Sequence, residues 1–405
     1  MQAQNQSDNP AVVKPLKTPS LQIILLTLCR LLFFTAQRFV YPFSMVLSRG
    51  LGVPLQSITF LISLNSATSL LGPIIGPISD RHGYRRMILS ALIMLTIGML
   101  VGGIFAYFPL MFLTFFLTGL GKSTMDPAIQ AYVSDRVAYH RRGMFIGLLE
   151  VSYAGSALIG IPLIALSIDQ ISWRAPFFIF SFGALIGFII IRITIDEDHD
   201  IRTHQTSYNL YHDLWQPVIK ARPSFGMVGF FFFSGMAIEN LFVVYGPWLE
   251  TRFGLNVVAL GLSATVIGFA ELCGAILSAL SSDRIGLKRT TIVGQIIVII
   301  SYAIIPILRL SLETVLTGLF IVFFIFEFTI VTSISLATEL LPGQRATMMA
   351  CLQAASGLGR TLGALIGIPL WLGGGIHATS CISVALCIVA LISISWGLKH
   401  WGEKY

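Results

Sequence analysis

Residues 76–86 read Gly-Pro-Ile-Ser-Asp-Arg-His-Gly-Tyr-Arg-Arg, and residues 279–289 read Ala-Leu-Ser-Ser-Asp-Arg-Ile-Gly-Leu-Lys-Arg. The two segments share an Asp-Arg pair, a glycine three residues after the aspartate, and two basic residues at the end. Each follows a long apolar run, and the two segments begin 203 residues apart in a chain of 405 residues. A repeat at half the chain length predicts two halves of similar structure in the same orientation.

Two shorter repeats support the same division. Leu-Ile-Gly-Ile-Pro-Leu occurs at 158–163 and again at 365–370, and Tyr41-Pro42 is echoed by Tyr245-Gly246-Pro247. A polar stretch separates the halves. The predicted parts are a tail (1–20), a first half (21–195), a linker (196–223) and a second half with a short tail (224–405).

The apolar content of the chain excludes an ordinary soluble domain. Hydrophobic residues make up 55% of the chain and charged residues 11%, whereas soluble domains carry about 25% charged residues. Runs of about twenty apolar residues, the length that crosses a bilayer, recur throughout. We therefore predict an all-α membrane protein. Its twelve spans are expected at 21–47, 55–79, 87–106, 110–133, 144–168, 175–195, 224–248, 257–281, 291–308, 313–337, 346–371 and 378–397.

The basic residues predict the orientation of the chain. With the amino terminus inside, the inner segments hold eighteen Lys and Arg residues and the outer segments hold four. Because basic loops stay on the cytoplasmic side, both termini are expected in the cytoplasm. The net charge of +7 is thereby explained by topology, which excludes a nucleic-acid partner.

No pattern in the sequence indicates an enzyme. The five cysteines lie in apolar runs, and the histidines lack the spacing of metal ligands. There is also no constellation of nucleophile and base. We therefore expect no catalytic residues, no metal and no cofactor.

The repeated loop resembles a motif of the major facilitator superfamily, Gly-x-x-x-Asp-Arg-x-Gly-x-Arg/Lys-Arg/Lys, found between the second and third helices. The resemblance covers about residues 21–397 and implies two pseudo-symmetric six-helix bundles. It also implies that the motif latches one access state of a transporter, while a simple topology signal is the alternative. The latch residues are Gly76, Asp80, Arg81, Gly83, Arg85, Arg86, Asp283, Arg284, Gly286, Lys288 and Arg289.

A second motif is similar to one found in the drug:proton antiporter branch of this family. Trp173, Arg174, Pro176 and Phe177 precede the sixth predicted span in the pattern of that branch. The resemblance implies proton-coupled efflux of a small organic molecule by alternating access, in the plasma membrane. Proton-coupled uptake of a sugar or organic anion is an alternative, and a non-transporting receptor or scaffold is a third interpretation. The protein is expected to work as a monomer.

Nine ionisable residues fall deep inside predicted spans, where a lipid-facing charge is costly. They lie on spans that line the cavity or the interface in the resembled architecture. The proton-coupling candidates are the acids Asp126, Glu239, Glu150, Glu271 and Glu327. The cavity or substrate candidates are the bases Arg30, Arg38, Lys122 and Arg360.

Spacing suggests partners for some of these residues. Lys122 and Asp126 are four residues apart and share a helix face, so they form either a structural pair or a proton site tuned by the lysine. Glu327 and Arg360 occupy similar depths on consecutive spans, which favours a structural bridge. No partner is predicted from spacing for the other acids. Glu239 and Asp126 are ranked first among the proton-coupling candidates.

Overall fold

The computed structural model describes residues 19–72, 75, 82–136, 149, 151–195, 216–341, 344–399 and 401, and the regular structure in these ranges is helical throughout. The first half contains α1 Pro19–Arg38, α2 Ser44–Leu51, α3 Leu55–Ala67, the 3-10 turn η1 Thr68–Leu71, α5 Tyr84–Phe105, α6 Phe108–Arg136, the π-helical turn η2 Ser156–Gly160, α8 Ile161–Gln170 and α9 Ala175–Thr194. The second half contains α10 Gln216–Lys220, α11 Arg222–Phe253, α12 Val257–Ile285, α13 Leu287–Ile304, α14 Leu312–Leu340 and α15 Arg345–Gly397. Most of the predicted linker lies outside the described residues.

Among the described residues, nine helices are long and apolar enough to cross a membrane, or ten with α2 and α3–η1, which are bent by 115° relative to each other. α1 leads into α2 through the turn at 39–43, and α3 continues into η1. α15 is 53 residues long and contains two spans, because the backbone bends at Gly375, where φ is 62° and ψ is −159°. A straight helix of that length would measure about 80 Å, far more than a bilayer.

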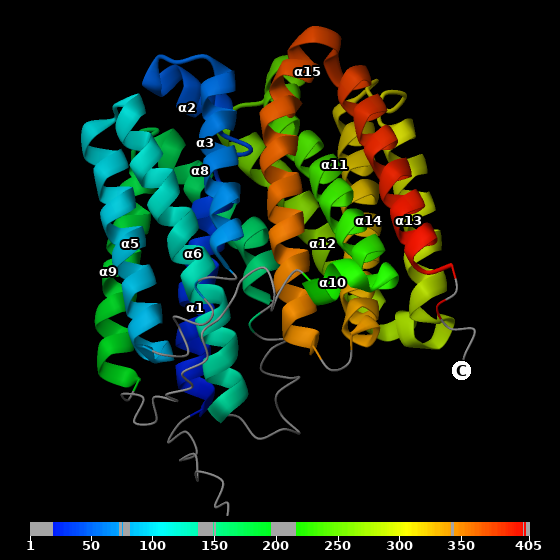
Figure 1. Cartoon of the computed structure of the whole chain (residues 1–405). Coiled ribbons are helices and arrows are strands. Elements are labelled where there is room, and N and C mark those ends of the chain that lie inside the picture. The colour runs from blue at the N-terminus through cyan, green and yellow to red at the C-terminus, as the bar shows by residue number, and fades with distance from the viewer. Residues whose placement is uncertain are drawn as a thin grey trace, which may run out of the picture.

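The chain builds two bundles that lie side by side (Figure 1). In the first bundle, α5 packs against α6 and α9, and in the second α11 packs against α15 and α12 against α14. α1 begins at the lower face of Figure 1, whereas α2 and the bend of α15 lie at its upper face. Because successive spans alternate in direction, the described residues of the two loop motifs belong to the lower face.

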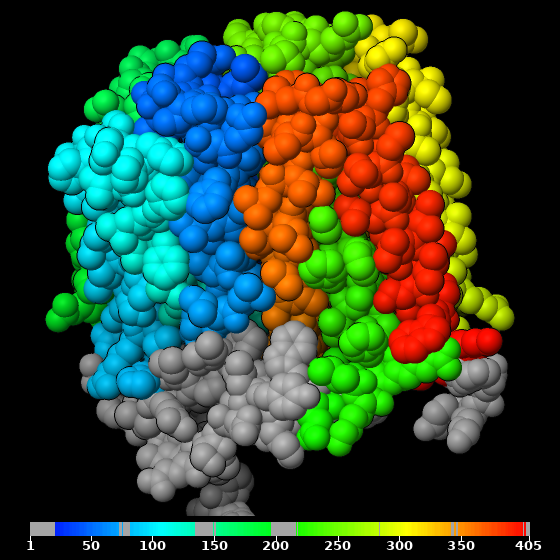
Figure 2. Space-filling view, turned by 45° about the horizontal axis from the view of Figure 1, so that its top comes forward, coloured from blue at the N-terminus to red at the C-terminus, as the bar shows by residue number. Residues whose placement is uncertain are grey.

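Two helix pairs form the seam between the bundles. α3 and η1 contact α15, and η2 and α8 contact α12. Figure 2 shows the first of these contacts, with α3 in blue beside the first part of α15 in orange. The helices approach closely here. A Cβ atom added to Gly268 of α12 would lie 2.7 Å from the Cβ atom of Ala157 in η2.

The backbone repeats the pseudo-symmetry of the sequence. Gly83 before α5 has φ and ψ of 88° and 141°, and its counterpart Gly286 before α13 has 98° and 122°. A side chain at either position would be strained, since positive φ disfavours residues with a Cβ atom. The glycines of the two motifs therefore make the same tight reversal in each half.

The upper face is closed by contacts between the halves. A Cβ atom at Gly246 of α11 would lie 2.5 Å from the carbonyl oxygen of Tyr41, so the two Tyr-Pro repeats pack directly on each other. Nearby, Arg49 Nη1 lies 2.5 Å from Glu250 Oε1 and joins α2 to α11.

Candidate functional site

Seven of the nine ionisable residues of the predicted spans are gathered into three groups. In the first, Arg38 of α1 joins Glu271 of α12 across the seam. Arg38 Nη2 donates to both carboxylate oxygens, at 2.8 Å and 2.9 Å, and both residues are buried. An ion pair removed from solvent is stable only when further hydrogen bonds satisfy it.

Tyr153 supplies part of that support. It precedes η2, and its carbonyl oxygen accepts from Arg38 Nη1 at 3.3 Å. Its hydroxyl lies 3.4 Å from Glu271 Oε1, and its ring lies 4.4 Å from the guanidinium carbon of Arg38. The Phe242 ring of α11 lies 5.4 Å from the same guanidinium carbon. The pair is thus held by both halves.

The second group is centred on Glu239 of α11, whose residue exposure is 0%. The hydroxyl of Tyr41 donates to Glu239 Oε1 at 2.6 Å, which forms a second buried contact between the halves. Arg360 Nη1 of α15 lies 3.8 Å from Glu239 Oε2. This oxygen has no hydrogen-bond partner among the described residues. Glu239 is therefore a buried carboxylate with one hydrogen bond and one long ionic contact.

The third group lies in the first half. Arg30 Nε of α1 lies 3.1 Å from Asp126 Oδ1 of α6, and Lys122 Nζ lies 3.7 Å from Asp126 Oδ2. The spacing of Lys122 and Asp126 correctly indicated their contact, to which the structure adds Arg30. Both cations also lie close to the Phe34 ring. Arg30 Cζ is 5.1 Å and Lys122 Nζ is 5.0 Å from the centroid of this ring.

Depth distinguishes these groups. Arg30 precedes Arg38 by eight residues, which is about 12 Å along a helix toward the lower face. The side chains of Lys122, Asp126 and Arg360 are 31%, 23% and 36% exposed, whereas Arg38, Glu239 and Glu271 are buried. The contacts of Arg38 and Glu239 across the seam are thus buried, whereas Lys122, Asp126 and Arg360 are partly exposed.

Some candidates gain a contact that spacing did not predict, and others are not described. Arg360 contacts Glu239, and Glu327 lies on α14 beside Gly274 of α12, so the bridge between Glu327 and Arg360 stays a prediction. Glu150, Gly76, Asp80 and Arg81 lie outside the described residues, as does the side chain of Asp283.

The remaining motif residues lie at the lower face. Arg85 Nη2 donates to the carbonyl oxygen of Arg192 at 2.6 Å, and Lys288 Nζ donates to that of Trp401 at 2.9 Å. Each contact ties the start of a span to the end of the last span in its own half. Arg86, Arg284 and Arg289 share these segments.

Sequence reasoning missed the aromatic members of the site. Tyr41 and Tyr153 are neutral side chains within apolar runs, and a search for buried charges passes over them. Phe34 and Phe242 are ordinary span residues by composition. The one available signal was the Tyr-Pro repeat, which marked position 41 without indicating its partner.

Comparisons with known proteins agree with the fold. The model of the Major Facilitator Superfamily matches residues 26–364 and 231–400. The MFS-type transporter YceJ of Bacillus subtilis is 24% identical over 300 residues, covering 74% of this chain and 75% of its own. Multidrug resistance protein 2 of the same organism is 23% identical over 256 residues, covering 60% and 63%.

A solved structure shows the same fold. The peptide transporter POT in complex with sulfate superposes with a TM-score of 0.76 at 13% identity, covering 93% of this chain and 94% of that one. The family match spans most of the chain and its fold is that of a known transporter, so the chain belongs to the major facilitator superfamily of membrane transporters.

Proposed function

We propose that this protein is a proton-coupled secondary transporter that exports small organic molecules by alternating access. Its halves, 21–195 and 224–405, rock about the seam and are connected by the linker at 196–223. Both termini face the cytoplasm, the membrane is the bacterial plasma membrane, and the monomer is the working unit. The similarity to a multidrug resistance protein supports the direction of transport.

The geometry of Glu239 is the observation that carries this proposal. Glu239 is buried, bonded across the seam to Tyr41, and has an oxygen without a hydrogen bond among the described residues. Buried carboxylates in membrane spans are costly and mark proton pathways in transporters. Glu239 is therefore placed where its charge and the contact between the halves depend on each other.

Opening of the upper face requires that this contact break. The separation of the halves would remove Tyr41 from Glu239 and Arg38 from Glu271. A carboxylate that loses its partner while it stays buried is strongly destabilised unless water or a proton reaches it. When the upper face is open, Tyr41 no longer donates a hydrogen bond to Glu239. A proton that enters from this face and binds Glu239 then removes the negative charge of the carboxylate. Release of the proton after reclosure restores the original contact.

Among the acids, Glu239 fits this role better than Asp126 or Glu271. Asp126 lies against two cations, and Glu271 is held by two hydrogen bonds from Arg38. Glu239 instead has one long ionic contact, and one of its oxygens has no hydrogen bond among the described residues. The partly exposed Lys122 and Arg360 instead offer contacts to a substrate.

A flux assay in proteoliposomes tests the function. The purified protein is reconstituted with an internal pH dye and exposed to a lipophilic cation, a sugar and an organic acid. Proton movement with the lipophilic cation supports export of drug-like molecules. A response to the sugar or organic acid alone would replace export with uptake, and no response to any solute would count against proton coupling.

Substitution of Glu239 separates coupling from binding. Glu239→Gln keeps the size of the side chain and should abolish transport driven by a pH gradient while solute exchange without a gradient persists. Asp126→Asn is the matched control and should retain gradient-driven transport. Gradient-driven transport by Glu239→Gln at the wild-type rate would refute the assignment of the carrier.

A further inference from the structure

A pocket at the upper face of the second half lies outside the site described above. It is formed by the end of α11, the turn at 305–311 and the bend of α15, and its volume is about 750 Å³. This size is in the range of pockets that bind small molecules. Trp248 follows Glu239 by nine residues, which is about 14 Å along α11. The pocket is thus more than two helical turns from the central carboxylate.

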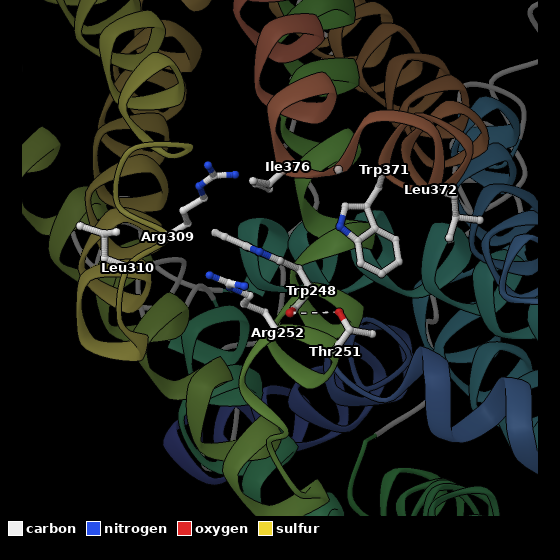
Figure 3. Close-up of a pocket in the computed structure, with 9 residues that line it drawn as sticks. Trp248, Thr251, Arg252, Arg309, Leu310, Trp371, Leu372 and Ile376 are labelled. Atoms are coloured by element: carbon white, nitrogen blue, oxygen red, sulfur yellow. Dashed lines mark hydrogen bonds between the residues drawn. The ribbon is translucent and has the colours of Figure 1, made fainter.

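The lining combines cations with aromatic rings. Arg252 and Trp248 come from the last turns of α11, Arg309 from the turn, and Trp371 from α15 just before its bend. Figure 3 shows these four side chains around one space, with the guanidinium groups of both arginines on the same side of it. Guanidinium groups suit carboxylate and phosphate, and indole rings suit flat apolar bodies.

The two arginines differ from the other basic residues of the upper face. Arg49 is paired with Glu250, and the guanidinium carbon of Arg174 lies 5.3 Å from the ring of Trp173. Arg252 and Arg309 are exposed, and neither has an ion pair or side-chain hydrogen bond to another residue that the structure describes. Two cations therefore face one pocket without an acidic partner in the described lining.

The remaining polar group of the lining does not offset this charge. The hydroxyl of Thr251 donates to the carbonyl oxygens of Pro247 and Trp248, at 2.7 Å and 3.3 Å. Its donor capacity is used within α11, as the dashed line in Figure 3 indicates for Trp248. Leu372 and Ile376 complete an apolar wall.

We propose that this pocket is a second binding site, distinct from the central site, for a molecule that carries an anionic group on an aromatic or aliphatic body. Arg252 and Arg309 bind the anionic group, and Trp248 and Trp371 contact the body. The occupant comes from one of two sources, a soluble organic anion or the headgroup of an anionic lipid. The site is separate from the proposed proton carrier, because Trp248 lies more than two helical turns beyond Glu239 on α11.

Equilibrium binding of 2-naphthoate tests the chemistry. The full chain in nanodiscs of phosphatidylcholine should bind 2-naphthoate saturably and bind its neutral analogue 2-naphthylmethanol more weakly. The double variant Arg252→Gln/Arg309→Gln should lose about tenfold or more in affinity for the acid, since two charge-assisted contacts are removed. The control Arg174→Gln removes an upper-face cation outside the pocket and should bind like the wild type.

Phosphatidylglycerol distinguishes the two sources. If a lipid headgroup occupies the pocket, adding this lipid to the nanodiscs suppresses naphthoate binding. Native mass spectrometry should then find phosphatidylglycerol retained by the wild type but lost from the double variant. If the lipid has no effect, a soluble anion is the occupant. The proposal is overturned if the wild type and the double variant bind naphthoate equally and retain phosphatidylglycerol equally.

Discussion

The hydroxyl of Tyr41 donates a 2.6 Å hydrogen bond to Glu239 Oε1, between residues of opposite halves and at positions buried from solvent. Phe242 of α11 packs on the same tyrosine, with ring centroids 4.1 Å apart. This single contact joins an acid of the second half to the segment where the first span turns, at 39–43. A change in the charge of the acid can therefore act directly on the closure of the upper face.

Tyr41→Phe removes only the hydroxyl from this contact. We expect a loss of stability of about 1–3 kcal/mol, because the buried carboxylate oxygen is left without its donor. We also expect the upper face to open more often. Spin labels at Gln56 and Thr251, on a background without native cysteines, report the distance across that face. The distance distribution should extend to longer values in Tyr41→Phe.

The control for this experiment is Tyr245→Phe. The hydroxyl of Tyr245 is buried on α11 and has no hydrogen-bond partner among the described residues. Its removal should leave the label distances unchanged. If Tyr41→Phe and Tyr245→Phe give the same distances as the wild type, the Tyr41 contact does not hold the upper face closed.

Arg38 and Glu271 should behave as a coupled pair in unfolding experiments. Arg38→Gln or Glu271→Gln alone leaves one buried charge without its partner, at a cost of about 3–5 kcal/mol. The double variant carries neither charge and should be more stable than either single variant. Thermal unfolding of the wild type, both single variants and the double variant in detergent measures this double-mutant cycle. Additive losses in the double variant would contradict a direct interaction between the two side chains.

The two cations beside Asp126 should contribute unequally to stability. Arg30 is buried and lies 3.1 Å from the carboxylate, whereas Lys122 lies 3.7 Å away with its side chain 31% exposed. Partly exposed ion pairs contribute little. We expect Arg30→Gln to lower the unfolding temperature by several degrees and Lys122→Gln to change it only slightly. The opposite order would show that Lys122 is the main partner of Asp126.

The sequence predicted the architecture well because repeated motifs and apolar runs can be recognised without knowing which helices pack against each other. The all-α membrane fold and the contact of Lys122 with Asp126 could both be predicted from apolar runs and from spacing. Partners across the seam could not be predicted. Arg38 and Glu271 are 233 positions apart, and their meeting depends on the rotation of each helix about its axis. For the same reason, the contact of Arg360 with Glu239 could not be predicted from the depth of the two residues in their spans.

The orientation of the chain predicts the labelling of the two loop motifs. Tyr84 and Leu287 are the first residues of α5 and α13 at the lower face. Cysteines at these positions should react with a membrane-impermeant thiol reagent in inverted vesicles and not in intact cells, since the basic motifs stay in the cytoplasm. A cysteine at the exposed Leu310 of the upper face should show the reverse pattern. Labelling of position 84 or 287 in intact cells would overturn the orientation.

Asp80 is the residue by which the latch interpretation can be separated from a topology signal. It lies outside the described residues, but its motif continues into Gly83 and Arg85 at the lower face. If its charge holds one access state, Asp80→Asn should give an inserted, folded protein that transports slowly. The ratio of cysteine labelling between the two faces should also shift, because the variant changes the relative free energies of two states. Asp80→Glu keeps the charge and should restore at least part of the activity. Wild-type transport and labelling in Asp80→Asn would leave the motif as a turn and a topology signal only. A reduced amount of inserted protein with normal transport per molecule would support the same conclusion, because the aspartate would then act in assembly rather than in the cycle.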